Sequence, residues 1–416
     1  MVHYITSRAF RIVPIPDGQE YTRIKKTSRV LYLSIAAMLV AAMGVAVGKL
    51  LTLLVQWLMA LSFFGDISKE VGTPENEDLG IWIIVIPVAG ALLLTWLSKY
   101  NKGFLNAIGL TVAIGNGAPM GIESPVMIFN GAIGNWIGKL LRCSPGECYV
   151  LFVAGTCSTL AGLFGAPIAA ILLVTECFFV VVTINTMIPV ILAAITAGIG
   201  SYLLRGATPV FNIPAAPNVT MQALLAYLGV GVLVGLWAKM SMNLSGLIDK
   251  LFGKLTTYSR WILLLAALVT GVAGYISPRA LGTGNNYMND LLQAHVTLSI
   301  LVALAVVKLV AWLFFSSAYK TGSGIIPVLV TGGAAALLVG VVIQLLFPAV
   351  VIHSGTLVLA GMAAMLAGTS RALFTAMVLA VELTHDVNTI LPVVAACCVS
   401  FCISLVTVFK TKAETI

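Results

Sequence analysis

Apolar runs follow one another along almost the whole chain, and only short polar stretches separate them. A helix needs about 20 apolar residues to cross the hydrocarbon core of a bilayer. The runs therefore predict an all-α polytopic membrane protein in which the shorter runs form broken or re-entrant helices. The runs cover residues 30–64, 80–98, 103–118, 126–141, 149–163, 167–184, 187–204, 220–248, 260–276, 297–315, 325–347, 355–367, 373–384 and 390–409.

The first run, Val30–Phe64, is longer than a single crossing requires. A helix over it would be about 52 Å long, against a hydrocarbon core of about 30 Å. We expect this helix to tilt strongly, to break near Gly44–Lys49, or to project from the membrane.

Glycine and proline interrupt several of the later runs. The interruptions lie at Gly115–Pro119, Gly121–Pro125, Pro167 and Gly322–Pro327. In a membrane such breaks leave backbone groups unpaired, so the broken ends must face a cavity or a bound solute. Some glycines have a simpler role, and Gly134-x-x-x-Gly138 is a pattern typical of close helix packing.

Two segments of the chain resemble each other. Residues 154–176 align without a gap on residues 360–382, and the segments end in Glu176 and Glu382. A Gly-rich break that ends in proline precedes each copy. Corresponding breaks in two halves are typical of repeat-built transporters whose site lies near the bilayer midplane. We therefore predict two inverted-topology repeats that meet at a midplane site. The predicted organisation is 1–29 as a basic N-terminus, 30–205 as membrane repeat 1, 206–409 as membrane repeat 2, and 410–416 as a short C-terminal tail without a regulatory domain.

The composition supports a membrane protein and excludes several other classes. The chain is 60% hydrophobic and 9% charged, with a mean hydropathy of +1.05, whereas soluble domains are about 25% charged. The net charge is +8, but no basic patch with interleaved aromatic residues indicates nucleic-acid binding. The seven cysteines form no CxxC pair and the four histidines are scattered. We therefore expect neither a metal site nor a cofactor.

Charges in the polar segments indicate an orientation. Basic residues gather in the first 29 residues, acidic residues in the loop Gly65–Leu79, and basic residues again at Lys99 and Lys102. By the positive-inside rule this alternation predicts a cytoplasmic N-terminus and an external first loop. We expect a multi-pass protein of the plasma (inner) membrane.

The breaks at Gly121–Pro125 and Gly322–Pro327 have the chemistry of an anion site. In each, proline stands in the first turn of a new helix, where its missing N–H is no loss. The preceding amides point into the break, and a helix N-terminus carries about half a positive charge. Two such termini that converge would bind an anion selectively without the tight grip of a lysine. The alternative for either break alone is an ordinary kinked helix closed by its neighbours.

Five of the charged residues in or beside the membrane runs are candidates for a specific role. Glu123 stands in the first break, where a charge is costly and indicates a functional group. It could occupy the site as a tethered anion and leave when protonated; the alternative is a simple N-terminal helix cap. Glu176 and Glu382 end corresponding helices against the helix dipole. We expect them to accept bonds from loop amides, with a proton relay as the alternative. We expect Lys49 and Lys308 to snorkel or to line an aqueous vestibule.

No catalytic arrangement accompanies these groups. His385–Asp386 follows an apolar helix and is expected to end it, and no nucleophile lies in a context that would support hydrolysis. We therefore predict that the protein is not an enzyme.

These motifs resemble the CLC family of chloride channels and proton-coupled anion antiporters. Gly121-Ile-Glu-Ser-Pro125 is similar to the family's GREGP motif, Gly322–Pro327 to its GxFxP motif, and Ala360–Pro392 to its closing segment. The resemblance implies a homodimer with inverted halves and one anion pathway in each subunit. It casts Glu123 as the gating glutamate. It assigns anion coordination to the backbone amides of Gly121, Ile122, Ser124, Gly324, Ile325 and Ile326.

The sequence departs from the family pattern at several positions. The Arg and Gly of GREGP are Ile122 and Ser124 here, and the Phe of GxFxP is Ile325. The serine of the family's first anion motif is missing after Tyr100, and the C-terminal segment has no tyrosine. Cys177 stands where many antiporters carry an internal proton-carrying glutamate. The fluoride–proton branch of the family departs in the same way.

We therefore expect transport of chloride or another halide through a glutamate-gated pathway, by a channel or by an H⁺/anion antiporter. The expected partners are the anion, protons, the lipid bilayer and a second copy of the chain. Two alternatives remain: a fluoride/proton antiporter of the same family, and a repeat-built secondary transporter for a small organic anion such as a carboxylate.

Overall fold

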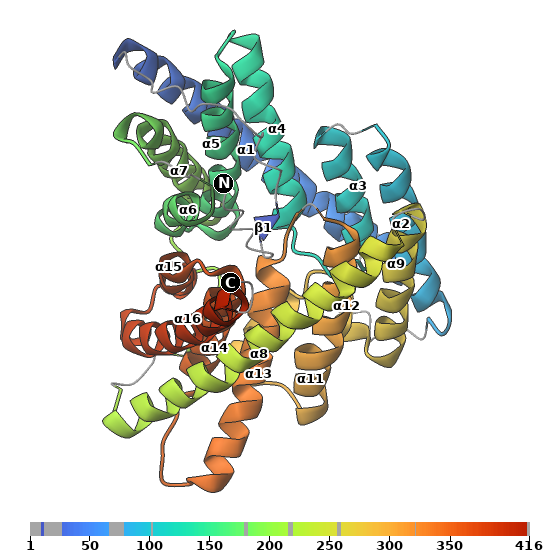
Figure 1. The fold of residues 1–416 in the computed structure, drawn as a ribbon, viewed down its shortest axis with the longest axis vertical. Coiled ribbons are helices and arrows are strands. Elements are labelled where there is room, and N and C mark those ends of the chain that lie inside the picture. Colours follow the sequence, from blue (N-terminus) through green and yellow to red (C-terminus); the bar gives the residue numbers. More distant parts are fainter. Residues whose placement is uncertain are drawn as a thin grey trace.

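The computed structural model describes residues 10–11, 27–65, 79–100, 103–178, 182–214, 219–255, 259–320 and 322–413. Helices make up nearly all of this part of the chain and surround a buried apolar core (Figure 1). The described residues also contain one antiparallel pair of two-residue strands, in which Phe10 faces Ser323 and Arg11 faces Gly322. The predicted all-α class is confirmed, with this short pair, β1 and β2, as an addition.

The helices begin and end close to the predicted apolar runs. In the first half the elements are β1 Phe10–Arg11, α1 Thr27–Met59, η1 Ala60–Phe64, α2 Trp82–Ser98, α3 Gly103–Gly115, α4 Glu123–Leu140, α5 Pro145–Phe164, α6 Pro167–Leu173, η3 Val174–Phe178 and α7 Ile184–Arg205. In the second half they are α8 Met221–Lys254, α9 Ser259–Ile276, η5 Pro278–Ala280, α10 Asn286–Leu292, α11 Leu298–Val302, η6 Ala303–Val307, α12 Lys308–Ala318, β2 Gly322–Ser323, α13 Ile325–Leu346, α14 Ser354–Ser370, α15 Leu373–Thr384, η7 Val387–Thr389 and α16 Ile390–Ala413.

α1 is a continuous helix that passes directly into η1, so the predicted break near Gly44–Lys49 is wrong. Gly44 instead lies between helices: a Cβ there would come within 2.8 Å of the side chains of Asn130 on α4 and Ser158 on α5. The glycine therefore serves close packing, and the α1 backbone keeps its hydrogen bonds. Lys49 is exposed on the same helix, as snorkelling requires. Tilt and projection remain the predicted ways to fit α1 to a bilayer.

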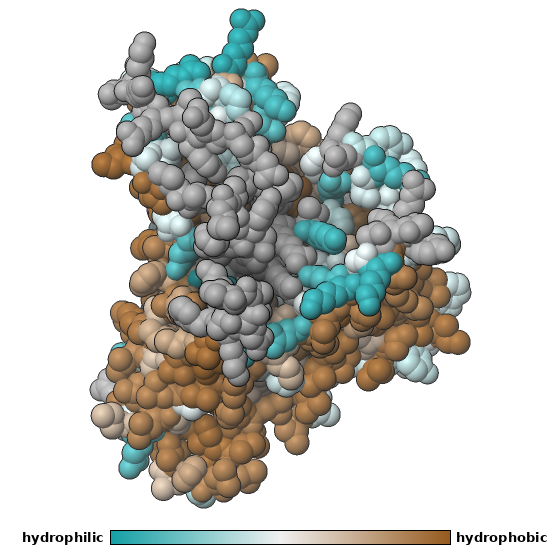
Figure 2. All heavy atoms as spheres, in the orientation of Figure 1, coloured by the Kyte–Doolittle hydropathy of each residue, from teal (hydrophilic) through white to brown (hydrophobic). Residues whose placement is uncertain are grey.

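Seven helices of the described residues are long and apolar enough to cross a membrane. They cover Ser28–Phe64, Pro145–Phe164, Ile184–Arg205, Met221–Lys254, Leu298–Ala318, Ile325–Leu346 and Val387–Val406. Shorter apolar helices of 10–17 residues accompany them, among them α2, α3, α14 and α15. Apolar side chains cover a large part of the surface, while hydrophilic ones gather toward one end (Figure 2). The protein is a multi-pass membrane protein, as the hydropathy predicted.

Close backbone contact fixes α4 against α5. A Cβ on Gly134 would overlap the carbonyl of Leu151, and one on Gly138 would lie 2.8 Å from the sulfur of Cys148. Any larger residue at these two positions would force the helices apart. The packing role predicted for this glycine pair is confirmed, and it holds α4, with the first break at its N-terminus, in a defined position.

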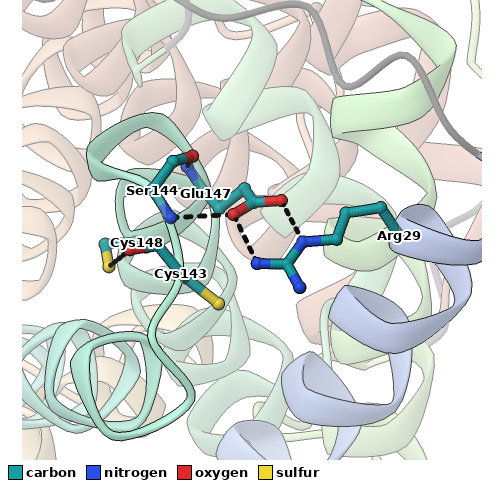
Figure 3. A network of polar contacts seen from close by, with 5 residues as sticks. All are labelled: Arg29, Cys143, Ser144, Glu147 and Cys148. Atoms are coloured by element: carbon teal, nitrogen blue, oxygen red, sulfur yellow. Dashed lines mark hydrogen bonds and ion pairs between the residues drawn. The ribbon is translucent and has the colours of Figure 1, made fainter.

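An ion pair fastens the start of α1 to the start of α5 (Figure 3). Arg29 donates from Nε to Oε1 of Glu147 over 2.6 Å and from Nη2 to Oε2 over 3.0 Å. The amide of Ser144 donates to Glu147 Oε2 over 2.8 Å, which completes a capping box on α5. Burial, followed by the negative charge of Glu147, raises the pKa of the nearby Cys143 thiol. The cluster joins α1 to α5, and through it to α4.

Parts of several predictions lie outside the described residues. These parts are most of the N-terminus 1–29, the acidic loop over 66–78, and Lys102. α16 continues to Ala413, so the first residues of the predicted tail 410–416 are helical. The division into repeats 30–205 and 206–409 remains a prediction.

Candidate anion site

The N-termini of α4 and α13, which follow the two predicted breaks, meet in the structure. α3 ends at Gly115, the chain turns through Gly117 with φ of 95°, and α4 begins at Glu123. In the second half, α13 begins at Ile325 directly after β2. The backbone amide of Ile326 donates to Oε1 of Glu123 over 3.2 Å. This hydrogen bond joins residues that are 203 positions apart in the sequence.

The side chain of Glu123 is completely buried, with 0% of its surface exposed. Its carboxylate folds back over Gly121, where a Cβ would overlap both carboxylate oxygens. Oε1 accepts from Ile326, whereas Oε2 has no hydrogen-bond partner among the described residues. The carboxylate therefore occupies the N-terminus of the opposite helix as a tethered anion would. A cap of its own helix alone does not account for this contact.

The backbone amides of the first break were expected to coordinate the anion, but the structure arranges them differently. The amide of Ser124 donates to the carbonyl of Gly121 over 3.0 Å, inside the turn that opens α4. It is therefore engaged, and in this conformation it is not available to an anion as expected. Ile122 is the N-cap residue of α4 and its side chain makes no capping bond. Gly121 supplies the space in which the Glu123 carboxylate lies.

The amides of the second break match the expectation more closely. Gly324 is the N-cap residue of α13, and the first-turn amide of Ile326 donates to Oε1 of Glu123. The N-terminal end of a helix carries unpaired N–H groups and a partial positive charge. The second break thus presents an anion-binding end, and Glu123 fills it.

Glu176, in η3 directly after α6, and Glu382, on α15, form a reciprocal pair of contacts; α6 and α15 lie side by side (Figure 1). Glu176 accepts from the amides of Phe374 at 2.9 Å and Thr375 at 2.8 Å, and also from the Thr375 hydroxyl at 2.6 Å. Glu382 accepts from the amides of Ile168 at 3.0 Å and Ala169 at 2.8 Å. Each carboxylate therefore satisfies first-turn donors of the helix from the other half of the chain.

These bonds bear on the two roles that the sequence allowed for Glu176 and Glu382. The expected amide partners are present, although they belong to helix first turns and not to loops. Both oxygens of each carboxylate are engaged, so neither group is poised to carry protons in this conformation. A structural role is the one that their geometry supports.

Lys308 is a second fully buried charge, with 0% of its surface exposed. Its Nζ donates to the carbonyls of Ala280 at 3.2 Å, Gly282 at 3.0 Å and Leu281 at 3.5 Å. The amide of Gly282 in turn donates to the carbonyl of Gly117 over 2.9 Å. The expectation of a snorkelling or vestibule lysine is therefore wrong for Lys308. It anchors a turn that is bonded to the segment leading into the first break.

Nothing in the sequence indicated that one residue, Trp312, lies beside the second break. Trp312 lies on α12 and packs against Gly324. A tryptophan in an apolar helix is ordinarily a packing residue, and its distance from the break in sequence does not reveal the contact. Cys177, which replaces the expected internal glutamate, lies in η3 and is partly buried.

The chain is similar to known anion transporters in sequence. A family model described as "Voltage gated chloride channel" matches residues 87–405. A Vibrio campbellii protein named H(+)/Cl(-) exchange transporter ClcA is 27% identical over 345 residues, which cover 80% of this chain and 72% of that protein. The protein of the same name from Vibrio parahaemolyticus is 26% identical over 357 residues, covering 82% and 75%.

Solved structures share the fold. A slow cyanobacterial Cl⁻/H⁺ antiporter matches with a TM-score of 0.77 and 19% identity over 92% of this chain and 98% of its own. A CLC-type fluoride/proton antiporter matches with a TM-score of 0.72 and 19% identity over 91% and 97%. The family match covers well over half of the chain, and it includes both breaks and Glu123 in the first of them. The chain therefore belongs to the voltage-gated chloride channel (CLC) family.

Proposed function

We propose that the CLC-like anion transport of this protein is proton-coupled exchange of a halide, with Glu123 as the gate. The observation that carries the proposal is the hydrogen bond from the Ile326 amide to the buried Glu123 carboxylate. A negatively charged side chain already occupies the helix end that would hold the transported anion. The side chain and the anion therefore compete for the same donors.

The competition supplies a gating step. When Glu123 is ionised, its carboxylate holds the α13 N-terminus and excludes a halide. When it is protonated, it is a weaker hydrogen-bond acceptor than the carboxylate, so a halide can displace it. Return of the carboxylate after loss of the proton drives the anion out. Because Gly121 has no Cβ, the carboxylate has room to fold into the break.

Proton coupling and the choice of anion are supported by the similar proteins. Two relatives are named H(+)/Cl(-) exchange transporters, and one similar structure is that of a fluoride/proton antiporter. Chloride and fluoride are both small anions that backbone amides can bind without a cationic side chain. We take chloride as the first substrate to test and fluoride as the second.

The test is ion flux from proteoliposomes that contain the purified protein. Vesicles loaded with KCl or KF should release the halide, and an external pH electrode should record proton movement in the opposite direction. Vesicles without protein provide the control. Potassium flux at a rate comparable with halide flux would contradict an anion pathway, and halide flux without proton movement would indicate a channel.

The same vesicles distinguish a transporter of organic anions. If the pathway is specific for halides, acetate or glutamate added on both sides should leave the halide flux unchanged. Strong competition by either anion, together with its own uptake, would favour an organic-anion transporter over a halide exchanger.

We also propose that the protein is a homodimer in the plasma membrane with a cytoplasmic N-terminus. The family resemblance supports the dimer, and the positive-inside rule supports the orientation. Light scattering of the protein in detergent, with the detergent mass subtracted, should give twice the 43.7 kDa of one chain. Protease protection of a tag before residue 29 in inverted and right-side-out vesicles tests the orientation.

A further inference from the structure

A buried hydrogen-bond donor stands beside the second break. Trp312 on α12 is 3% exposed, and its indole Nε1 has no hydrogen-bond partner among the described residues. An indole N–H is a donor only, so it can pair with an acceptor or an anion but never with a cation. Leaving a buried donor unpaired is unfavourable. The N–H of Trp312 is therefore available to an acceptor that comes within its reach.

The position of this donor is defined by Gly324. The place that a Cβ would take on Gly324 overlaps Nε1 and lies 2.6 Å from each of two ring carbons beside it. Gly324 is the N-cap residue of α13, two residues before the amide that holds Glu123. The edge of the indole that carries the N–H thus reaches the anion-binding end of α13, and the absence of a side chain at Gly324 gives it that place.

The resident carboxylate does not use this donor. Oε1 of Glu123 accepts from Ile326, and Oε2 has no partner among the described residues. The tethered anion therefore leaves the N–H of Trp312, beside the break, free. An occupant of a different size or position, such as a free halide, can accept from it together with the first-turn amides of α13.

We propose that the indole N–H of Trp312 is a side-chain donor to the transported halide at the N-terminus of α13. The inference rests on the proposed function, because it concerns the same anion and the same break. It gives this chain a side-chain N–H donor where its sequence lacks the serine and tyrosine hydroxyls expected from the family resemblance. The halide binds there when Glu123 has left.

The test removes the N–H while it keeps an aromatic ring. Trp312→Phe is introduced into the Glu123→Gln protein, so that no carboxylate competes, and chloride and fluoride binding are measured by calorimetry. Loss of one hydrogen bond to an anion should weaken halide affinity about tenfold. Trp237→Phe is the matched control: its Nε1 is also buried without a partner among the described residues, but it lies on α8, outside both breaks. The control should bind as tightly as its parent.

A second variant keeps the test decisive if Trp312→Phe does not fold. Incorporation of benzothienylalanine at position 312 replaces the indole N–H by sulfur and keeps the two-ring shape. Equal halide affinity in the parent and in a folded variant without the N–H would overturn the inference. Halide flux in the wild-type protein separates the two hypotheses. If the wild type carries no halide, the proposed function fails; if it carries halide while the loss of the N–H changes nothing, only the role of Trp312 fails.

Discussion

Substitution of Glu123 is the most direct perturbation of the proposed gate. In the structure its carboxylate is buried and accepts a hydrogen bond from the Ile326 amide. A hydrogen bond to an ionised group contributes about 2 kcal/mol, and a neutral one about 1 kcal/mol. Glu123→Ala removes the competitor altogether, whereas Glu123→Gln keeps a neutral acceptor of nearly the same shape.

These energies convert into expected affinities. At a pH where the wild-type carboxylate is ionised, Glu123→Ala should bind halide about thirtyfold more tightly and Glu123→Gln about fivefold. Both variants should conduct halide with no dependence on pH and without proton movement, because the titrating group is gone. Calorimetry gives the affinities, and proteoliposome flux between pH 5 and 8, with simultaneous pH recording, gives the coupling.

A matched control and a contrary result complete the design. Glu176→Gln neutralises another carboxylate that accepts hydrogen bonds from backbone amides. Those amides belong to α15, and Glu176 lies outside both breaks. This variant should keep the wild-type dependence on pH. If folded Glu123→Gln and Glu123→Ala proteins retained the wild-type pH dependence and proton flux, Glu123 would be only a helix cap and the gating mechanism would be wrong.

Other substitutions test the geometry around the gate and the contacts between the two halves. Gly121→Ala places a Cβ where the Glu123 carboxylate lies, so it should displace the carboxylate and weaken the pH dependence of halide flux. Gly229→Ala is its control, because a Cβ there has no neighbour within 4 Å and the flux profile should not change. Glu176→Ala and Glu382→Ala should each lower the free energy of unfolding by about 2 kcal/mol, since first-turn donors, among them those of the buried Thr375 and Ala169, lose their acceptors. Thermal denaturation in detergent measures this loss, and unchanged melting temperatures would contradict the role of the reciprocal contacts.

The sequence alone determined the class of protein and the position of most helices, and it predicted the two breaks that meet in the structure. Long apolar runs can be stable only as membrane helices, so their limits follow from local composition; the run 373–384 coincides with α15. Glycine together with proline marked the end of α3 and the starts of α4, α6 and α13, because the effect of these residues on the backbone is local. A charged residue at such a break, Glu123, was conspicuous for the same reason.

Tertiary structure decided what these elements touch. Gly44 suggested a helix break from the sequence. In the structure it lets α1 pack against Asn130 and Ser158, and the helix is not interrupted. Lys308 resembled a snorkelling lysine, but three carbonyls of a distant turn enclose it. In both cases the local pattern was compatible with two outcomes, and the neighbouring segments selected one.

The partners of the acidic and aromatic groups were likewise beyond the reach of sequence patterns. Glu123 meets Ile326, Glu382 meets the start of α6, and Trp312 reaches the N-cap of α13 only because the two halves of the chain pack together. Hydrophobic periodicity records which residues are buried, but it contains no information on which buried face meets which. Hydrogen bonds between residues some 200 positions apart depend on that packing, and only the folded chain specifies it.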